Sequence, residues 1–151
     1  MFTDTRRISE AGAWVHIKDG RRPAYWVDEK GNVDEDRPVR IKMLGPDSET
    51  LQKRSRKRVA KRIKSAGGSM EMSKMSSAEI EEMLENNSGA VAENMADATL
   101  TWENVPGEDG KPLEFSAENA LWLYETYPAI ARQLQDEAGD IDDFLELAAK
   151  N

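Results

Sequence analysis

The sequence predicts an α+β fold: a small N-terminal antiparallel β-meander plus a basic helix, followed by an all-helical acidic C-terminal module. Three observations support this prediction. Apolar and polar residues alternate in short runs before residue 45, which is typical of half-buried strands. Beyond residue 76, capping residues precede apolar positions at helical spacing. Residues 1–67 carry a net charge of +7 and residues 68–151 one of −15, so the chain has a basic half and an acidic half.

Three runs near the N-terminus are predicted strands, at residues 13–18, 24–28 and 39–44. The first two are rich in aromatic and β-branched residues and end at turns that contain glycine. In the third run, apolar side chains alternate with Arg40 and Lys42, which places both cations on its polar face. The simplest arrangement is a three-stranded antiparallel meander, whose apolar face needs a helix or a partner to cover it.

A strongly basic helix is predicted over residues 49–66. Eight of the twelve residues in 53–64 are Lys or Arg. The apolar residues Leu51, Val59 and Ile63 form one narrow stripe at four-residue spacing, so we expect the helix to touch the body of the protein there and to present its cations elsewhere. Its candidate electrostatic residues are Arg54, Arg58, Lys61 and Arg62.

Small, polar and Met-rich residues at 67–77 predict a flexible linker. The predicted domains are therefore residues 1–66, which hold the meander and the basic helix, and residues 78–151, which hold the acidic helical module. Within this module, N-capping residues and a proline mark the first turns of helices. These helices are expected to begin near Ala78, Ala90, Ser116, Pro128 and Asp140.

The residue inventory argues against an enzyme. The chain has no cysteine and His16 is its single histidine, which excludes a disulfide framework, a thiolate zinc site and a His-pair metal site. No partner residue for catalysis can be named beside His16. The acidic run at 136–143 lacks the ligand spacing of a calcium loop, and capping of a helix by Asp140 explains most of it. We expect no catalytic activity, no cofactor and no bound metal.

A membrane partner is not expected either. No apolar run approaches the roughly 20 residues that a membrane helix needs, and the N-terminus lacks the apolar stretch of a signal peptide. The basic helix offers little apolar area for insertion into a membrane surface. The expected location is the cytoplasm.

An apolar surplus marks the helix expected after Ser116. That helix is apolar almost all around, because it contains Leu121, Trp122, Leu123, Tyr124 and Tyr127. This is more than one small core needs, so one flank of the helix is expected to face a partner; coverage by a helix of the other half is the alternative. Trp122 and Tyr127 are favoured because such aromatic residues dominate binding hot spots. The candidate partner-binding residues are Trp102, Phe115, Trp122, Tyr124 and Tyr127.

Four segments of the acidic half form an ordered set. They are Trp102-Glu103-Asn104-Val105, Asp109-Gly110-Lys111-Pro112-Leu113, Phe115-Ser116-Ala117-Glu118-Asn119 and Tyr127-Pro128-Ala129-Ile130. Together they resemble the C-terminal part of the tail assembly chaperones of long-tailed phages. In that family a tryptophan precedes an acidic Asp-Gly-Lys-Pro turn, and a helix opening with Phe-Ser-x-Glu-Asn and a proline-started helix follow. The resemblance covers about residues 100–146.

The resemblance implies a non-catalytic protein that binds the tape-measure protein, and later the tail tube protein, during tail assembly. Such proteins act in the host cytoplasm and are absent from the finished virion. From the residues, a second copy of the chain is a further expected partner, because the two halves are oppositely charged. The alternative function is a nucleic-acid-binding accessory phage protein that acts through the basic helix 49–66. A third, weaker hypothesis is an acidic decoy, in which residues 136–146 imitate nucleic acid.

Overall fold

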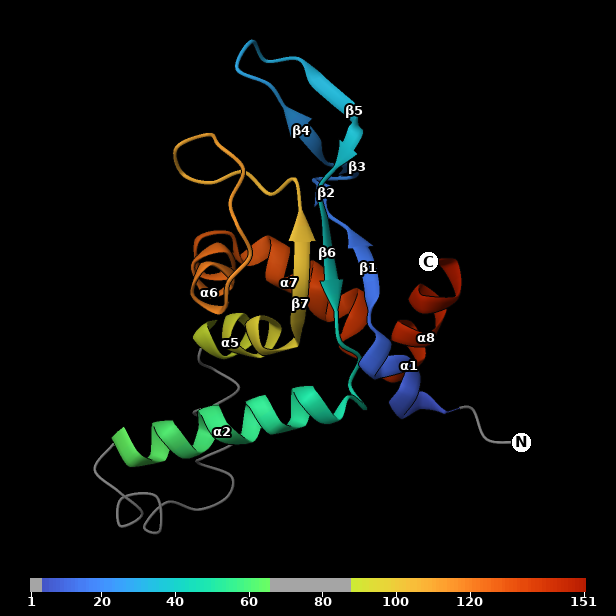
Figure 1. Cartoon of the computed structure of the whole chain (residues 1–151), viewed down its shortest axis with the longest axis vertical. Coiled ribbons are helices and arrows are strands. Elements are labelled where there is room, and N and C mark those ends of the chain that lie inside the picture. The colour runs from blue at the N-terminus through green and yellow to red at the C-terminus, as the bar shows by residue number, and fades with distance from the viewer. Residues whose placement is uncertain (1–3, 66–87) are drawn as a thin grey trace.

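A three-stranded antiparallel sheet lies at the centre of the fold, and both halves of the sequence contribute to it (Figure 1). In this computed structural model, which describes residues 4–65 and 88–151, the strand order is β1-β6-β7. The strands are β1 (Ala13–His16), β6 (Arg40–Met43) and β7 (Thr99–Glu103). The central strand β6 therefore pairs with β1 of the basic half on one side and with β7 of the acidic half on the other.

The pairing register gives the sheet one buried face. Val15 lies opposite Ile41, and Ile41 lies opposite Trp102. These three side chains are buried, and α7 crosses behind the strands in Figure 1. The neighbouring row on the other face holds Trp14 and Lys42, which are only partly buried because side chains alternate along a strand.

The predicted meander differs from the observed sheet. Residues 24–28 contain β4 (Tyr25–Val27), which pairs with β5 (Val33–Pro38) in a hairpin that projects from the helices (Figure 1). A short second hairpin joins β2 (Lys18–Asp19) to β3 (Arg22–Pro23). Residues 24–28 therefore do not form the third strand beside β1 and β6, as the predicted meander requires. That strand is β7, from the acidic half.

The α+β class and the helices of the C-terminal part are confirmed. The helices are α1 (Thr5–Ala11), α2 (Glu49–Ser65), α5 (Ser88–Ala98), α6 (Ala117–Thr126), α7 (Pro128–Ala138) and α8 (Ile141–Lys150). Ser116 and Asp140 cap α6 and α8 as predicted, and Pro128 is the first residue of α7. One correction concerns the all-helical module: the helix expected near Ala90 is α5, which ends at Ala98, and the strand β7 follows at once.

The helices of the acidic half pack against the buried face of the sheet, and in the described part of the chain they share one hydrophobic core with it. Its largest fully buried apolar side chains come from strands, loops and helices alike. They include Val15, Ile41, Met43, Leu44, Tyr124, Leu134 and Phe144. The predicted linker at residues 67–77 and the helix expected near Ala78 lie outside the described residues.

Candidate partner-binding surface

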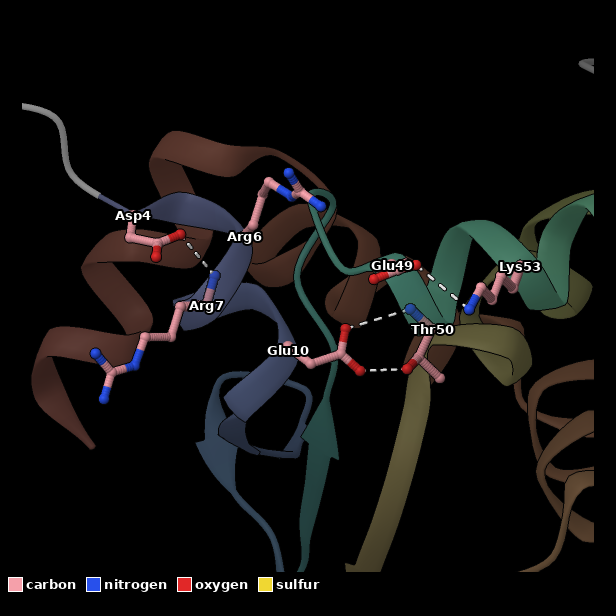
Figure 2. Close-up of a pocket in the computed structure, with 7 residues that line it drawn as sticks. All are labelled: Asp4, Arg6, Arg7, Glu10, Glu49, Thr50 and Lys53. Atoms are coloured by element: carbon pink, nitrogen blue, oxygen red, sulfur yellow. Dashed lines mark hydrogen bonds and ion pairs between the residues drawn. The ribbon is translucent and has the colours of Figure 1, made fainter.

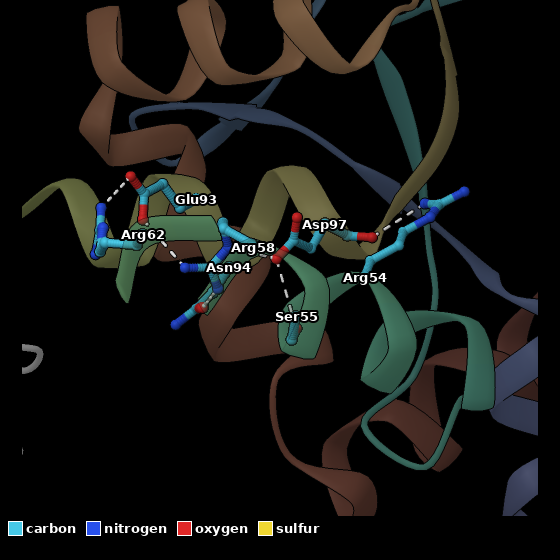
Figure 3. A network of polar contacts seen from close by, with 7 residues as sticks. All are labelled: Arg54, Ser55, Arg58, Arg62, Glu93, Asn94 and Asp97. Atoms are coloured by element: carbon cyan, nitrogen blue, oxygen red, sulfur yellow. Dashed lines mark hydrogen bonds and ion pairs between the residues drawn. The ribbon is translucent and has the colours of Figure 1, made fainter. Parts of the chain in front are cut away.

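Arg58 joins α2 to α5 through three hydrogen bonds (Figure 3). Its Nε donates to Asp97 Oδ2 over 2.6 Å, and its Nη1 donates to Glu93 Oε2 over 3.1 Å. Its Nη2 donates to Asn94 Oδ1 over 2.5 Å. The charged side chains of Arg58, Glu93 and Asp97 are only 22%, 19% and 16% exposed. This partial shielding from water makes the pairs stronger than ordinary surface ion pairs.

Arg54 and Arg62 extend this contact by one helical turn on either side of Arg58. All three lie on one face of α2 because they are four residues apart. Arg62 pairs with the second carboxylate oxygen of Glu93. Arg54 donates to the main-chain oxygen of Asp97 over 3.0 Å, where the C-terminal end of α5 favours a positive charge. In this structure the basic helix thus pairs with the acidic half of the same molecule.

The apolar stripe of α2, which was predicted to contact the body of the protein, does so only in part. Leu51 packs against the core, but Val59 is 39% exposed. The arginine face lies against α5 instead, because two carboxylates of α5 have the same four-residue spacing as the arginines. The prediction that the cations point away from the body is therefore wrong for Arg54, Arg58 and Arg62.

A groove of about 680 Å³ lies between α2, α5 and the start of α6. From α2 it is lined by the cations Arg54, Lys57, Arg58 and Lys61. From the other elements it is lined by the apolar side chains Ala96, Phe115, Ala117 and Leu121, and by the acidic Glu93, Asp97 and Glu118. The groove thus brings Phe115, a predicted partner-binding residue, to the same surface as three of the predicted electrostatic residues.

An aromatic pair marks the corner between α6 and α7. Trp122 and Tyr127 meet edge to face, with ring centroids 6.3 Å apart and an angle of 86° between the rings. Trp122 packs partly against the core, whereas Tyr127 is 50% exposed. Tyr127 ends α6 and precedes Pro128, the first residue of α7, so the chain direction changes at the exposed ring. We name Trp122 and Tyr127 the aromatic corner.

Trp102 and Tyr124, which were also expected at the partner surface, are buried. Trp102 packs edge to face on Phe115 at 5.1 Å, and its Nε1 donates to the oxygen of Leu113 over 2.8 Å. Tyr124 lies on the core side of α6, where its hydroxyl and Thr99 Oγ1 are hydrogen-bonded over 2.7 Å. Burial raises the pKa of the Tyr124 hydroxyl above its usual range, which keeps the hydroxyl protonated. The apolar surplus is therefore divided between the core and the aromatic corner.

The polar hollow between α1 and the start of α2 is a capping site (Figure 2). It has a volume of about 490 Å³, and charged side chains of both signs line it. The Glu10 carboxylate accepts hydrogen bonds from Ser48 Oγ over 2.8 Å, from the Thr50 backbone nitrogen over 3.2 Å and from the Thr50 hydroxyl. Ser48 Oγ in turn accepts from the Leu51 nitrogen over 3.1 Å. Ser48 is adjacent to the helix that it caps, whereas Glu10 comes from another helix, so sequence reasoning missed Glu10.

Replacement of Glu10 by Gln is expected to destabilise the protein by about 1 kcal/mol at pH 7, as loss of a helix cap does. Hydrogen bonds from Thr50 and Ser48 lower the pKa of Glu10. A carboxylate with a lowered pKa stabilises the fold above its unfolded pKa of about 4.3, and that stabilisation is lost as the pH falls through the folded value. Thermal unfolding of both proteins should therefore show a difference that shrinks below about pH 4. The exposed Glu29→Gln is the control, and an equal loss there would contradict the capping role.

The ring of His16 contacts the chain a few residues further on. His16 Nε2 lies 2.8 Å from the main-chain oxygen of Ala24, and its ring meets Tyr25 edge to face at 5.1 Å. Within residues 4–65 and 88–151, no group of His, Asp or Glu could hold a metal ion. In the same ranges, no helix has the length and apolar character needed to cross a membrane.

Comparison with known proteins gives one match. A sequence model of the family described as YdaY prophage protein matches residues 47–150. Neither a curated protein nor a solved structure matches the chain. The matched range begins just before α2 and ends at the last residue of α8, so it contains the groove, the arginine contacts and the aromatic corner.

Proposed function

The chain belongs to the YdaY prophage protein family, and we propose that it is a non-catalytic tail assembly chaperone of a prophage. In this proposal it binds the tape-measure protein, and later the tail tube protein, in the host cytoplasm and leaves before the virion is complete. The observation that carries the proposal is the aromatic corner, where Tyr127 is half exposed on a rigid turn between two helices. The resemblance of residues 100–146 to tail assembly chaperones supports it independently.

The corner is suited to cover apolar surface on a helical partner. Its two rings support each other edge to face, and Trp122 is packed against the core, so little side-chain freedom is lost on binding. Trp and Tyr bury much area while their polar edges tolerate water, which suits a surface that must be exposed before and after the complex. The net charge of −8 would speed encounter with a basic segment of the partner more than it would raise affinity.

A binding assay with the purified tape-measure protein tests the proposal. Wild type is expected to associate, and Trp122→Ala with Tyr127→Ala is expected to weaken binding by at least about thirtyfold, the effect of removing a hot spot. Val33→Ala is the matched control, because Val33 is an exposed apolar residue on the projecting hairpin. Absence of association by the folded wild type would overturn the proposal, as would equal losses in both variants.

Nucleic-acid binding through residues 49–66 is the alternative function. It is the weaker of the two, because Arg54, Arg58 and Arg62 contact α5 and because three carboxylates line the same groove. Phosphate backbones are bound by cations, and nearby carboxylates oppose that attraction. A binding assay at two salt concentrations decides it: strong affinity for DNA or RNA with a steep salt dependence favours it.

A further inference from the structure

The charges of α2 exceed what the neighbouring helix neutralises. Helix α2 carries eight Lys and Arg residues and one acidic residue, whereas α5 carries two acidic residues. Arg58 and Arg62 already pair with those two carboxylates. Arg54 donates to main-chain oxygens, and Lys57 pairs with no carboxylate among the described residues. On the side of α2 that lines the groove, α5 therefore leaves the positive charges of Arg54 and Lys57 without a paired carboxylate among the described residues.

The cations along the groove form one stripe. Arg54, Lys57, Arg58 and Lys61 stand at relative positions 0, 3, 4 and 7, which lie on a single face of a helix. The stripe rises about 10 Å along α2, or about two turns. A helix lying beside it would thus meet cations over about two of its own turns.

Apolar side chains lie across the groove from this stripe. Phe115 is held by its edge-to-face contact with Trp102, and Leu121 and Ala96 are partly buried against the core. Ala117, in the first turn of α6, is exposed. A ligand in the groove therefore meets apolar surface on one side and the cationic side chains of α2 on the other.

We propose that this groove binds an amphipathic helix of a partner protein, with acidic residues toward α2 and apolar residues toward the start of α6. Amphipathic helices bind grooves through apolar anchors at spacings of three, four and seven residues, which matches the two turns available. Charge complementarity selects an acidic helix over a basic one. The apolar lining selects a helix with an apolar face over a nucleic acid, whose backbone offers no such face. The site is separate from the aromatic corner and does not depend on the chaperone proposal.

The test is fluorescence anisotropy with the full chain and a labelled peptide of about 14 residues. The Leu residues of this peptide are three and four positions apart, and its other residues are Glu and Ala. A scrambled peptide of the same composition is the reference. Lys57→Glu and Ala117→Glu are each expected to weaken binding about tenfold. Arg56→Glu makes the same charge change on the same helix outside the groove, and it should weaken binding by less than about twofold. Trp122→Ala should leave it unchanged, which separates this inference from the chaperone proposal.

Four results would overturn the inference. Equal binding of the scrambled peptide would show attraction by charge alone, and equal losses in Lys57→Glu and Arg56→Glu would move the contact away from the groove. Tighter binding of single-stranded DNA than of the peptide would make α2 a nucleic-acid surface. Residues 78–85 of this chain, Ala-Glu-Ile-Glu-Glu-Met-Leu-Glu, share the chemistry of the proposed ligand. A tenfold gain in peptide affinity on changing Glu79, Glu81 and Glu82 to Gln would make that segment the occupant.

Discussion

Phe144→Ala is expected to lower the free energy of unfolding by about 3–5 kcal/mol. Phe144 lies on α8 and is fully buried. A Cβ added to Gly45 would stand 2.7 Å from its ring, so the ring is packed directly against the backbone that connects β6 to α2. The Gly45 nitrogen also donates to the oxygen of Ser9 over 3.0 Å, which holds this backbone in place. The cavity left by the ring therefore cannot collapse, which places the cost at the upper end of the range.

Urea unfolding followed by circular dichroism measures this loss. Leu147→Ala, on the same helix but only partly buried, is the matched control and should cost less than half as much. Gly45→Ala should also destabilise, since the added methyl group meets both the ring and the Ser9 hydroxyl. In the double variant Gly45→Ala with Phe144→Ala the losses should be less than additive, because the methyl group then enters space that the ring has vacated. Additive losses would contradict the contact.

The elements that the sequence predicted well are those fixed by residues close together in the chain. The caps at Ser116 and Asp140 each accept a hydrogen bond from a backbone nitrogen three residues on, and the start of α2 follows Ser48 in the same way. The sheet was harder. Strand β5 is mostly charged, so it lacks the local pattern of a strand, and β7 pairs with β6 across about sixty residues. Their pairing depends on tertiary contacts that no short window contains.

The candidate surface was predicted in its residue types but not in its contacts. The arginines of α2 were identified as electrostatic residues, yet their acceptors on α5 were not. A usable signal existed: Arg54, Arg58 and Arg62 stand four residues apart, and so do Glu93 and Asp97. The aromatic surplus of α6 was also real, but only the packing direction of α6 separates buried Tyr124 from exposed Tyr127. The sequence shows that aromatic side chains are numerous in this region, but it does not show which of them are buried in the core.

Arg58→Ala is expected to lower the free energy of unfolding by about 2–3 kcal/mol, below the full cost of breaking a buried ion pair because the pair is about one fifth exposed. The loss would leave Asp97 without its guanidinium partner and Glu93 with Arg62 alone. Arg54→Ala should cost about 1 kcal/mol, because Arg54 bonds only to main-chain oxygens. In a double-mutant cycle, Arg58→Ala and Asp97→Ala should show a coupling energy of about 1–2 kcal/mol. A coupling energy near zero would mean that the ion pair between Arg58 and Asp97 does not stabilise the fold.

Arg58→Lys then separates charge from geometry. A lysine keeps the positive charge, but its single ammonium group cannot reproduce the planar fork that reaches Glu93, Asn94 and Asp97 at once. We therefore expect Arg58→Lys to recover less than half of the stability lost in Arg58→Ala. Full recovery would show that α2 is held by charge alone. Partial recovery would instead mean that Arg58 fixes the position of α2 over α5, and with it the spacing of Arg54, Lys57 and Lys61 along the groove.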